Sequence, residues 1–454
     1  MGERLDEFWQ EYGVHTQTQT RDRREYGYHY LSGLLRIKSR RTIAEISRTA
    51  SVSTQNMHHY ISKSPWSGAK VIKQVRNAIA WHPHFASGSV LLGDESADDR
   101  CGDVLAGGGR QYNGRLGKVD FSQVGVFLSL AKEGKHNWID GELYLPAKWF
   151  DEEHAALRQR VGVPSERQFQ TKIELFWQMV ERVQREEIPF DAVACDDLYG
   201  QSFWLRTQLD QAGIEFYADI PANTRIYLSE PQIGIPQNRR GRKAQKARVL
   251  SPLSYRVDDL RSHPSVLWQS LTLRPTERGW LTAEFARLPV WTVQDDLTVT
   301  QQWLLIRKEG KKHSYTFSNA APETPLKVMA LRKSQRYFIE RDNQEAKSEF
   351  GWDEIHTTSF RAWEHQLAFT ILAQWFITQT RLDWDERYPR DPELLTHYAV
   401  DVLPALSVAN VRELLRATLP LPTLSPLGAA ALVVEYLHNR TRSRQSRILN
   451  RSDP

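Results

Sequence analysis

The chain is short of cysteine and of long apolar runs. It has 454 residues and two cysteines, Cys101 and Cys195, which form no CxxC pair and no zinc-ligand spacing. A disulfide-stapled fold and a cysteine zinc site are therefore excluded, and a reducing cytosol is the simplest compartment. No apolar run approaches the roughly 20 residues that a membrane helix needs. Residues 1–6 include acids and no apolar core, so we expect no signal peptide.

The chain also lacks a dominant charge. Sixty Lys and Arg face 55 Asp and Glu, which gives a net charge of +5. This excess permits nucleic-acid binding without demonstrating it, so the distribution of charge is more informative than its sum. The length predicts two or three domains with a sizeable core.

The N-terminal region is predicted to be helical, because residues 5–66 show no strand alternation. Apolar residues at helical spacing indicate two short helices on either side of residues 51–53, with Ser53 capping the second. In this helix-turn-helix layout Gln55 and Asn56 point outward, where they can hydrogen-bond to bases or phosphates. An ordinary helical hairpin with a polar outer face explains the same pattern equally well.

The middle of the chain predicts three strands, a helix, a strand, a helix and a strand. The strands are expected at 90–93, 124–130, 138–145, 192–195 and 215–220, with the first helix opening at 164 and residues 107–112 in a loop. This is the order of an RNase H-like fold that lacks its last helix. Asp94 and Asp196 each follow an apolar run, and in that fold the two strands are neighbours. Both acids could instead be helix N-caps.

A helix over 336–347 supplies the missing element. Its acid Glu340 shares one helical face with Arg336 and Lys347, and with Lys333 one turn earlier. A carboxylate flanked by cations suits a site that holds a metal ion and a phosphate together. Glu340 could also be an exposed helical acid paired with Arg336. It follows Asp196 by 144 residues, too far for a simple loop.

That interval is predicted to be a β-rich insertion over 222–325. Strand-like alternation recurs at 266–274, 280–285, 290–293, 298–307 and 314–318. Near its start lies a run of cations without an acid, which includes Arg239, Arg240, Arg242 and Lys243. Such a run is usually a solvated loop, but beside a suspected nuclease site we favour contact with phosphates.

An ordered set of motifs carries a family resemblance. They are the residues at 94–96, 109–120, 143–146, 196–200, 318–320 and 339–340, with Trp149, Lys347 and Gly351. In this set the sequence resembles the DDE-type transposases of bacterial insertion sequences, in the branch with a β-strand insertion before the Glu. The similarity covers nearly the whole chain. It departs at position 333, where the family has Tyr and this chain has Lys.

The resemblance implies an α/β protein with an RNase H-like catalytic core interrupted by a β-rich insertion, and helical N- and C-terminal regions. We expect a helical DNA-binding region at 1–85, the core at 86–221 and 326–380 around the insertion at 222–325, and a helical region at 381–454. The end of the last region, with Arg440, Arg442, Arg444, Arg447 and Arg451, is predicted to be a disordered basic arm.

The implied activity is Mg²⁺-dependent cleavage of transposon ends and joining of the 3′-OH to target DNA. Asp94, Asp196 and Glu340 would hold two Mg²⁺ ions, with Asp94 bridging them and Mn²⁺ able to substitute. A catalytically inactive or domesticated relative that only binds DNA as a regulator is the alternative. The four tryptophans of the insertion, Trp268, Trp280, Trp291 and Trp303, could stack on a flipped base, but we expect packing in the strand core.

The implied partner is double-stranded DNA, as terminal inverted repeats and as target, bound by a homodimer in the bacterial cytoplasm at the nucleoid, without a membrane. The DNA-binding residues that we predict are Arg336, Lys347 and Lys333 beside the acids, the four cations of the basic run, Gln55 and Asn56 in the N-terminal helices, and Arg110 and Lys118 in the motif at 109–120.

Overall fold

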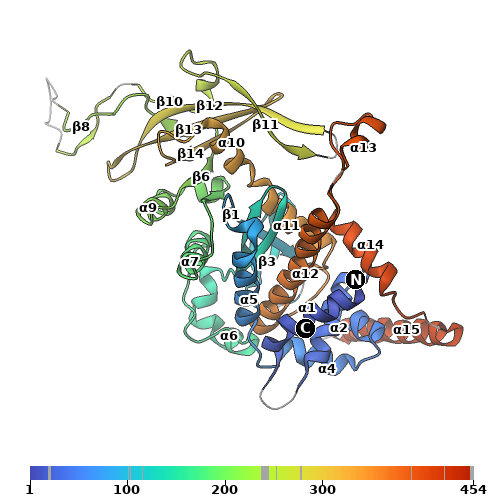
Figure 1. The fold of residues 1–454 in the computed structure, drawn as a ribbon. Coiled ribbons are helices and arrows are strands. Elements are labelled where there is room, and N and C mark those ends of the chain that lie inside the picture. Colours follow the sequence, from blue (N-terminus) through green and yellow to red (C-terminus); the bar gives the residue numbers. More distant parts are fainter. Residues whose placement is uncertain are drawn as a thin grey trace.

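The protein is a mixed α/β structure built around one long sheet (Figure 1). The computed structural model describes residues 1–18, 22–100, 102, 104–114, 116–236, 245–251, 253–276, 279–389, 391–423 and 425–449. Among these, no helix is both long and apolar enough to cross a membrane. The cations of the basic run, Arg239, Arg240, Arg242 and Lys243, lie outside the described residues.

Ten strands form the sheet, in the order β11-β12-β13-β14-β6-β5-β1-β3-β2, with β4 also paired to β3. The strands of the first half are β1 (Val90–Asp99), β2 (Gly109–Asn113), β3 (Lys118–Lys132), β4 (Lys135–Leu143), β5 (Ala192–Cys195) and β6 (Phe216–Ile220). The central strands β1, β5 and β6 are parallel, and the other pairs are antiparallel. The predicted neighbourhood of the first strand and the strand before Asp196 is therefore confirmed.

Two predicted boundaries in this half are wrong. Strand β1 does not end at 93 but runs through Asp94 to Asp99, because β3 continues to pair with it up to Ser122. Residues 109–112 are not a loop, because they pair with β3 as strand β2. In both places pairing with β3 extends the sheet over residues whose own composition is polar.

Helices cover both faces of the central strands. The helices between β4 and β6 are α6 (Ala155–Val161), α7 (Lys172–Arg185), α8 (Asp197–Gly200) and α9 (Phe203–Gln211). Helix α7 begins after Thr171, which forms a capping box with Glu174, and not at 164 as predicted. On the opposite face lie α11 (Tyr337–Ser348) and α12 (Phe360–Arg387), which contact β1 and β4 respectively.

The β-rich insertion is not a separate sheet. Its main strands are β11 (Gln269–Thr276), β12 (Gly279–Val293), β13 (Val299–Glu309) and β14 (Lys312–Ser318). Strand β14 pairs with β6, so the insertion extends the central sheet, at the top of Figure 1. The two strands predicted at 280–285 and 290–293 are one continuous strand. Trp280 is 55% exposed, so core packing was the wrong expectation for this side chain. Short pairs β7 (Arg225–Ile226) with β10 (Tyr255–Arg256) and β8 (Ile233–Gly234) with β9 (Arg248–Val249) complete the insertion.

The N-terminal helices pack against α12. They are α1 (Gly2–Tyr12), α2 (Arg24–Arg36), α3 (Ile43–Thr49), α4 (Thr54–Ser62) and α5 (Gly68–Trp81). Phe369 of α12 contacts the rings of Tyr30, Tyr60 and Trp66. As predicted, the Ser53 hydroxyl caps α4 by accepting from the Asn56 amide at 3.3 Å. Helix α12 is buried almost all round, which explains why its sequence is apolar on every side.

The remaining helices are α10 (Leu326–Ser334), α13 (Pro392–His397), α14 (Val408–Thr418) and α15 (Pro426–Leu449). A disordered arm is the wrong prediction for Arg440, Arg442 and Arg444, because these residues continue helix α15. The backbone at Arg447 is helical as well, whereas Arg451 lies outside the described residues.

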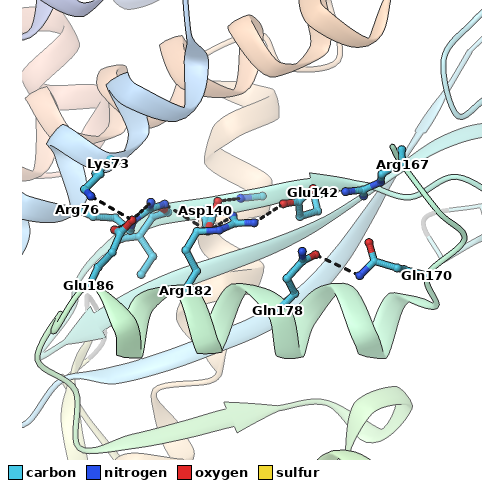
Figure 2. A network of polar contacts seen from close by, with 11 residues as sticks. Lys73, Arg76, Asp140, Glu142, Arg167, Gln170, Gln178, Arg182 and Glu186 are labelled. Atoms are coloured by element: carbon cyan, nitrogen blue, oxygen red, sulfur yellow. Dashed lines mark hydrogen bonds and ion pairs between the residues drawn. The ribbon is translucent and has the colours of Figure 1, made fainter. Parts of the chain in front are cut away.

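A buried ionic network joins α5 to the sheet (Figure 2). Arg76 of α5 donates from Nε to Glu186 at 2.7 Å and lies 3.2 Å from the Asp140 carboxylate of β4. Arg182 of α7 bridges Asp140 at 2.6 Å and Glu142 at 2.7 Å. Arg76 and Asp140 are almost completely buried. The network fixes the last N-terminal helix to the strand and helix behind the central sheet.

Candidate active site

Three acids lie in a row across the parallel strands. The register pairs Gly93 of β1 with Cys195 of β5, and Cys195 with Ala218 of β6. The next residue on each strand is Asp94, Asp196 and Asp219 respectively. Parallel strands therefore bring these carboxylates to one level of the sheet.

Strand alternation directs Asp94 toward helix α11. A Cβ at Gly93 would lie 2.1 Å from Phe176, which shows that position 93 faces α7. The next side chain points to the opposite face. There the Asn343 amide donates to Asp94 Oδ2 at 3.2 Å, and Trp138 Nε1 donates to the Asn343 oxygen at 3.1 Å. Asp94 is thus oriented by a chain of hydrogen bonds that begins in β4.

Asp196 is both an N-cap and a member of the row. Its Oδ1 accepts from the amides of Leu198 at 3.0 Å and Tyr199 at 3.4 Å, which starts the short helix α8. One oxygen remains outside these bonds. The N-cap alternative from the sequence is therefore correct for Asp196, where it is compatible with a place among the acids, and wrong for Asp94, which lies inside β1.

Arg336 connects the third predicted acid to the row. Its Nη2 lies 2.6 Å from Glu340 Oε1, and its Nε lies 3.1 Å from Asp219 Oδ2. Glu340 is half exposed on the first turn of α11. The predicted Arg336–Glu340 pair is present, and the same guanidinium reaches the sheet.

The charge of Asp196 acts on Asp94, and both acids act on Arg336. Burial, and then the charges of Asp196 and Glu95, raise the pKa of Asp94 well above its ordinary value. Burial and Glu95 raise the pKa of Asp196 to about 6. Burial lowers the pKa of Arg336, but the acids Asp219, Glu340, Asp94 and Asp196 together raise it above the ordinary value. Crowded carboxylates of this kind are stabilised by a bound cation.

Comparison with known proteins decides the family. The DDE superfamily endonuclease family matches residues 13–279 of the chain. The chain belongs to this family. A probable transposase for insertion sequence element IS701 from Microchaete diplosiphon is 24% identical over 323 residues, which cover 71% of this chain and 73% of the relative. Membership indicates a DNA-acting enzyme of the nuclease or transposase type, whose family generally uses divalent metal ions.

A second acidic group of this DDE endonuclease must be separated from the predicted one. Among the described residues, His136, Asp342 and Glu345 form the group of three whose ligand atoms lie within 4.8 Å of one another. His136 Nδ1 is 2.8 Å from Asp342 Oδ1, and Glu345 pairs with Arg341 at 2.8 Å. The buried Arg381 also interacts with both acids. Arg341 and Arg381 offset the charges of the two carboxylates, but Asp342 Oδ2 is buried without a hydrogen-bond partner, so this group is a second candidate for a cation. Asp94, Asp196 and Glu340 are more widely spaced.

The other predicted DNA contacts of this endonuclease differ in accessibility. Lys347 is bound to the Ala97 carbonyl and the Asp98 carboxylate, both at 2.9 Å. Lys333 is buried and pairs with Asp219 at 3.4 Å, so in this conformation its ammonium group is not accessible to a DNA phosphate. Arg110 and Lys118 are exposed on the β2–β3 hairpin, where Lys118 pairs with Asp120.

On the N-terminal helices, Gln55 and Asn56 are exposed on α4, as predicted. Asn56 donates to the Tyr26 hydroxyl at 3.0 Å. The outer face of α4 is therefore available to a ligand, and Tyr26 orients one of its two amides.

Sequence reasoning missed two residues of this site, Asn343 and Asp219. Asn343 follows Glu340 by three residues and could have been found from helical spacing, whereas Gln344, one residue later, does not face Asp94. Gln344 accepts from Arg341 at 2.8 Å, on the outer surface. Asp219 lies within an apolar strand, and its only sequence signal is an acid inside that run.

The raised pKa of Asp196 predicts a stability effect. Below pH 4 the acid is protonated in both the folded and the unfolded state, and above pH 6 the folded state pays for a buried charge. Asn at 196 can still cap α8. We therefore expect Asp196→Asn to raise the unfolding free energy of the metal-free protein by about 1–3 kcal/mol at pH 8. The gain should fade between pH 6 and 4. Thermal unfolding of the variant and the wild type at pH 8 and at pH 4 checks this, and a lower midpoint for the variant at pH 8 would contradict it.

Proposed function

We propose that this protein is a DNA transposase that cleaves the ends of its element and joins the freed 3′-OH to target DNA. The observation that carries the proposal is that Asp94 and Asp196 each follow a residue of the paired positions Gly93 and Cys195 on the parallel strands β1 and β5, with α11 packed against β1. Family membership supports the nuclease chemistry. The antiparallel β3–β1 pair followed by parallel β5 and β6 supports an RNase H-like core, interrupted after β6 by the insertion.

The donor set fits divalent metal ions. Asp94, Asp196 and Glu340 offer oxygen ligands, which Mg²⁺ prefers, and the first two are crowded buried acids. Two Mg²⁺ ions, or Mn²⁺ in their place, would activate the attacking oxygen and neutralise the leaving 3′ oxygen. Asn343 and the α8 amides hold Asp94 and Asp196 in place, which limits the reorganisation that ligand binding requires.

The cations around the acids suit a phosphate backbone. Arg336 places a positive charge beside the acids, where it attracts a phosphate, while its Nε and Nη2 are engaged by Asp219 and Glu340. Lys347 adds a charge on the same helix, about three turns later. In hydrolysis a water oxygen forms the new bond to phosphorus and the 3′ oxygen leaves. In strand transfer the 3′-OH takes the place of water, and an oxygen of the target strand leaves.

Mg²⁺-dependent nicking of DNA that carries the element's end sequence tests the proposal. Wild-type protein should nick near the end, and Asp94→Ala should bind the same DNA without nicking it. Binding without cleavage by the wild type would instead support the second candidate, an inactive relative that acts as a DNA-binding regulator. For either activity we propose that the protein acts on DNA as a dimer. Its proposed regions are the DNA-binding helices at 1–85, the core at 86–221 and 326–380, the insertion at 222–325 and the C-terminal region at 381–454.

The exposed face of α4 predicts sequence-specific binding. A paired amide contact to a base contributes about 1–3 kcal/mol of discrimination. We expect Gln55→Ala with Asn56→Ala to weaken binding to the element's end by about 10-fold or more, and binding to random DNA hardly at all. Fluorescence anisotropy on both duplexes measures this. Equal losses of affinity on both duplexes would show that α4 contacts only phosphates, and no loss on either would show that these two residues do not contact DNA.

A further inference from the structure

The Asp219 carboxylate binds two cations and a hydroxyl group beside the predicted acids. It lies at the level of Asp94 and Asp196, on the next parallel strand. Its Oδ2 is 3.1 Å from Arg336 Nε, and its Oδ1 is 3.4 Å from Lys333 Nζ. The Thr316 hydroxyl donates to Oδ1 at 2.5 Å. With two cations and a hydroxyl on its oxygens, Asp219 is engaged in holding side chains.

The insertion supplies further hydrogen bonds to Asp219 and Lys333. Thr316 is the cross-strand partner of Asp219 on β14, and Ser314 of the same strand accepts from Lys333 at 3.1 Å. Lys333 stands where the family pattern has Tyr. Its ammonium group is buried, and Asp219 is the carboxylate that pairs with it. The strand pairing and the substitution at 333 thus converge on one carboxylate.

Arg336 is held between Asp219 and the acids proposed to bind metal. Its Nε pairs with Asp219, and its Nη2 pairs with Glu340. The charges of Asp94 and Asp196 act on it as well. A guanidinium in this position neutralises the carboxylates when no divalent ion does so.

We infer that Asp219 is a positioning residue that anchors Arg336. The guanidinium of Arg336 is an internal counter-ion to the acids, and divalent metal ions must compete with it for them. This inference deepens the proposed function and rests on it for the identity of the metal-binding acids. Asp219 and Glu340 share this guanidinium, at 3.1 Å and 2.6 Å respectively, so Asp219 takes part of the interaction that Arg336 would otherwise give to the acid that the metal needs. Loss of Asp219 should therefore leave Arg336 to pair more strongly with Glu340.

Metal affinity without DNA tests the inference by a measurement that requires no catalysis. Mn²⁺ binding, followed by electron paramagnetic resonance, should be tighter in Arg336→Gln than in wild type, because the competing charge is removed. It should be weaker by about 10-fold in Asp219→Asn, the size of effect that residues behind a metal ligand commonly have. In the double variant the Asp219→Asn effect should vanish, since there is no guanidinium left to release.

Two outcomes would overturn the inference. One is an Asp219→Asn effect of the same size with and without Arg336, and the other is weaker Mn²⁺ binding by Arg336→Gln. If Asp219→Asn does not fold, Arg336→Gln alone decides, because it leaves the Lys333–Asp219 pair in place. Asp94→Ala separates this test from the proposed function. If Asp94→Ala binds Mn²⁺ as wild type does, the metal-binding acids are misassigned, whatever the role of Asp219.

Discussion

Glu340→Gln should bind the element's end with wild-type affinity and cleave it at least about 10³-fold more slowly. The substitution keeps the length of the side chain and an oxygen that can accept from Arg336, but it removes the charge proposed to hold a metal ion. A metal ion contributes several kcal/mol of charge stabilisation in phosphoryl transfer, and 4 kcal/mol corresponds to about 10³-fold in rate. Single-turnover cleavage and a binding titration on the same DNA separate the two effects.

Glu345→Gln is the matched control for this prediction. It makes the same chemical change five residues later, in the His136–Asp342–Glu345 group on another face of α11. We expect cleavage within about 10-fold of wild type once thermal unfolding shows that the variant is folded. Fast cleavage by Glu340→Gln together with a loss of about 10³-fold in Glu345→Gln would move the site to the histidine group.

Asp140→Ala should destabilise the junction between the N-terminal helices and the sheet by about 1–3 kcal/mol. The substitution leaves Arg76 and Arg182 without their shared carboxylate (Figure 2). Arg76 keeps Glu186 and Arg182 keeps Glu142, but each buried guanidinium loses one of its two carboxylate partners, so its charge is less fully compensated. Native-state hydrogen exchange of amides in α5 and β4 measures the free energy of local opening.

Lys73→Ala provides the comparison within the same network. Lys73 is 58% exposed and lies 4.0 Å from Glu186, and exposed pairs of this kind contribute about 0–1 kcal/mol. We expect exchange in α5 to be nearly unchanged. Similar losses in Asp140→Ala and Lys73→Ala would show that burial does not set the strength of this network.

The sequence predicts the elements whose own residues determine them. Residues 192–195 are a short buried run that ends in an acid, and they form β5 with Asp196 immediately after it. Ser53 has the composition and position of an N-cap, and it caps α4. Local signals of this kind need no knowledge of the partner strand or helix.

The rest depends on contacts between distant segments. Residues 94–99 are mostly polar, and only their pairing with β3 makes them a strand. The helix predicted over 336–347 was expected to share one face with Lys333 a turn earlier, but the chain breaks between α10 and α11 at residues 335 and 336. The break turns Lys333 into the protein, where Asp219 binds it. Asp219 itself joins the site through its register with β5, which no local pattern can reveal.

The proposed site can be mapped directly with Fe²⁺ in place of Mg²⁺. Reductant and peroxide generate hydroxyl radicals at bound Fe²⁺, which cut the polypeptide close to the ion, and mass spectrometry locates the cuts. If Asp94, Asp196 and Glu340 hold the metal ions, cuts will fall near residues 94, 196 and 340, will be suppressed by excess Mg²⁺, and will be lost in Asp94→Asn. Cuts near residue 136 with none near 94 or 196 would contradict the account and place the metal at His136, Asp342 and Glu345.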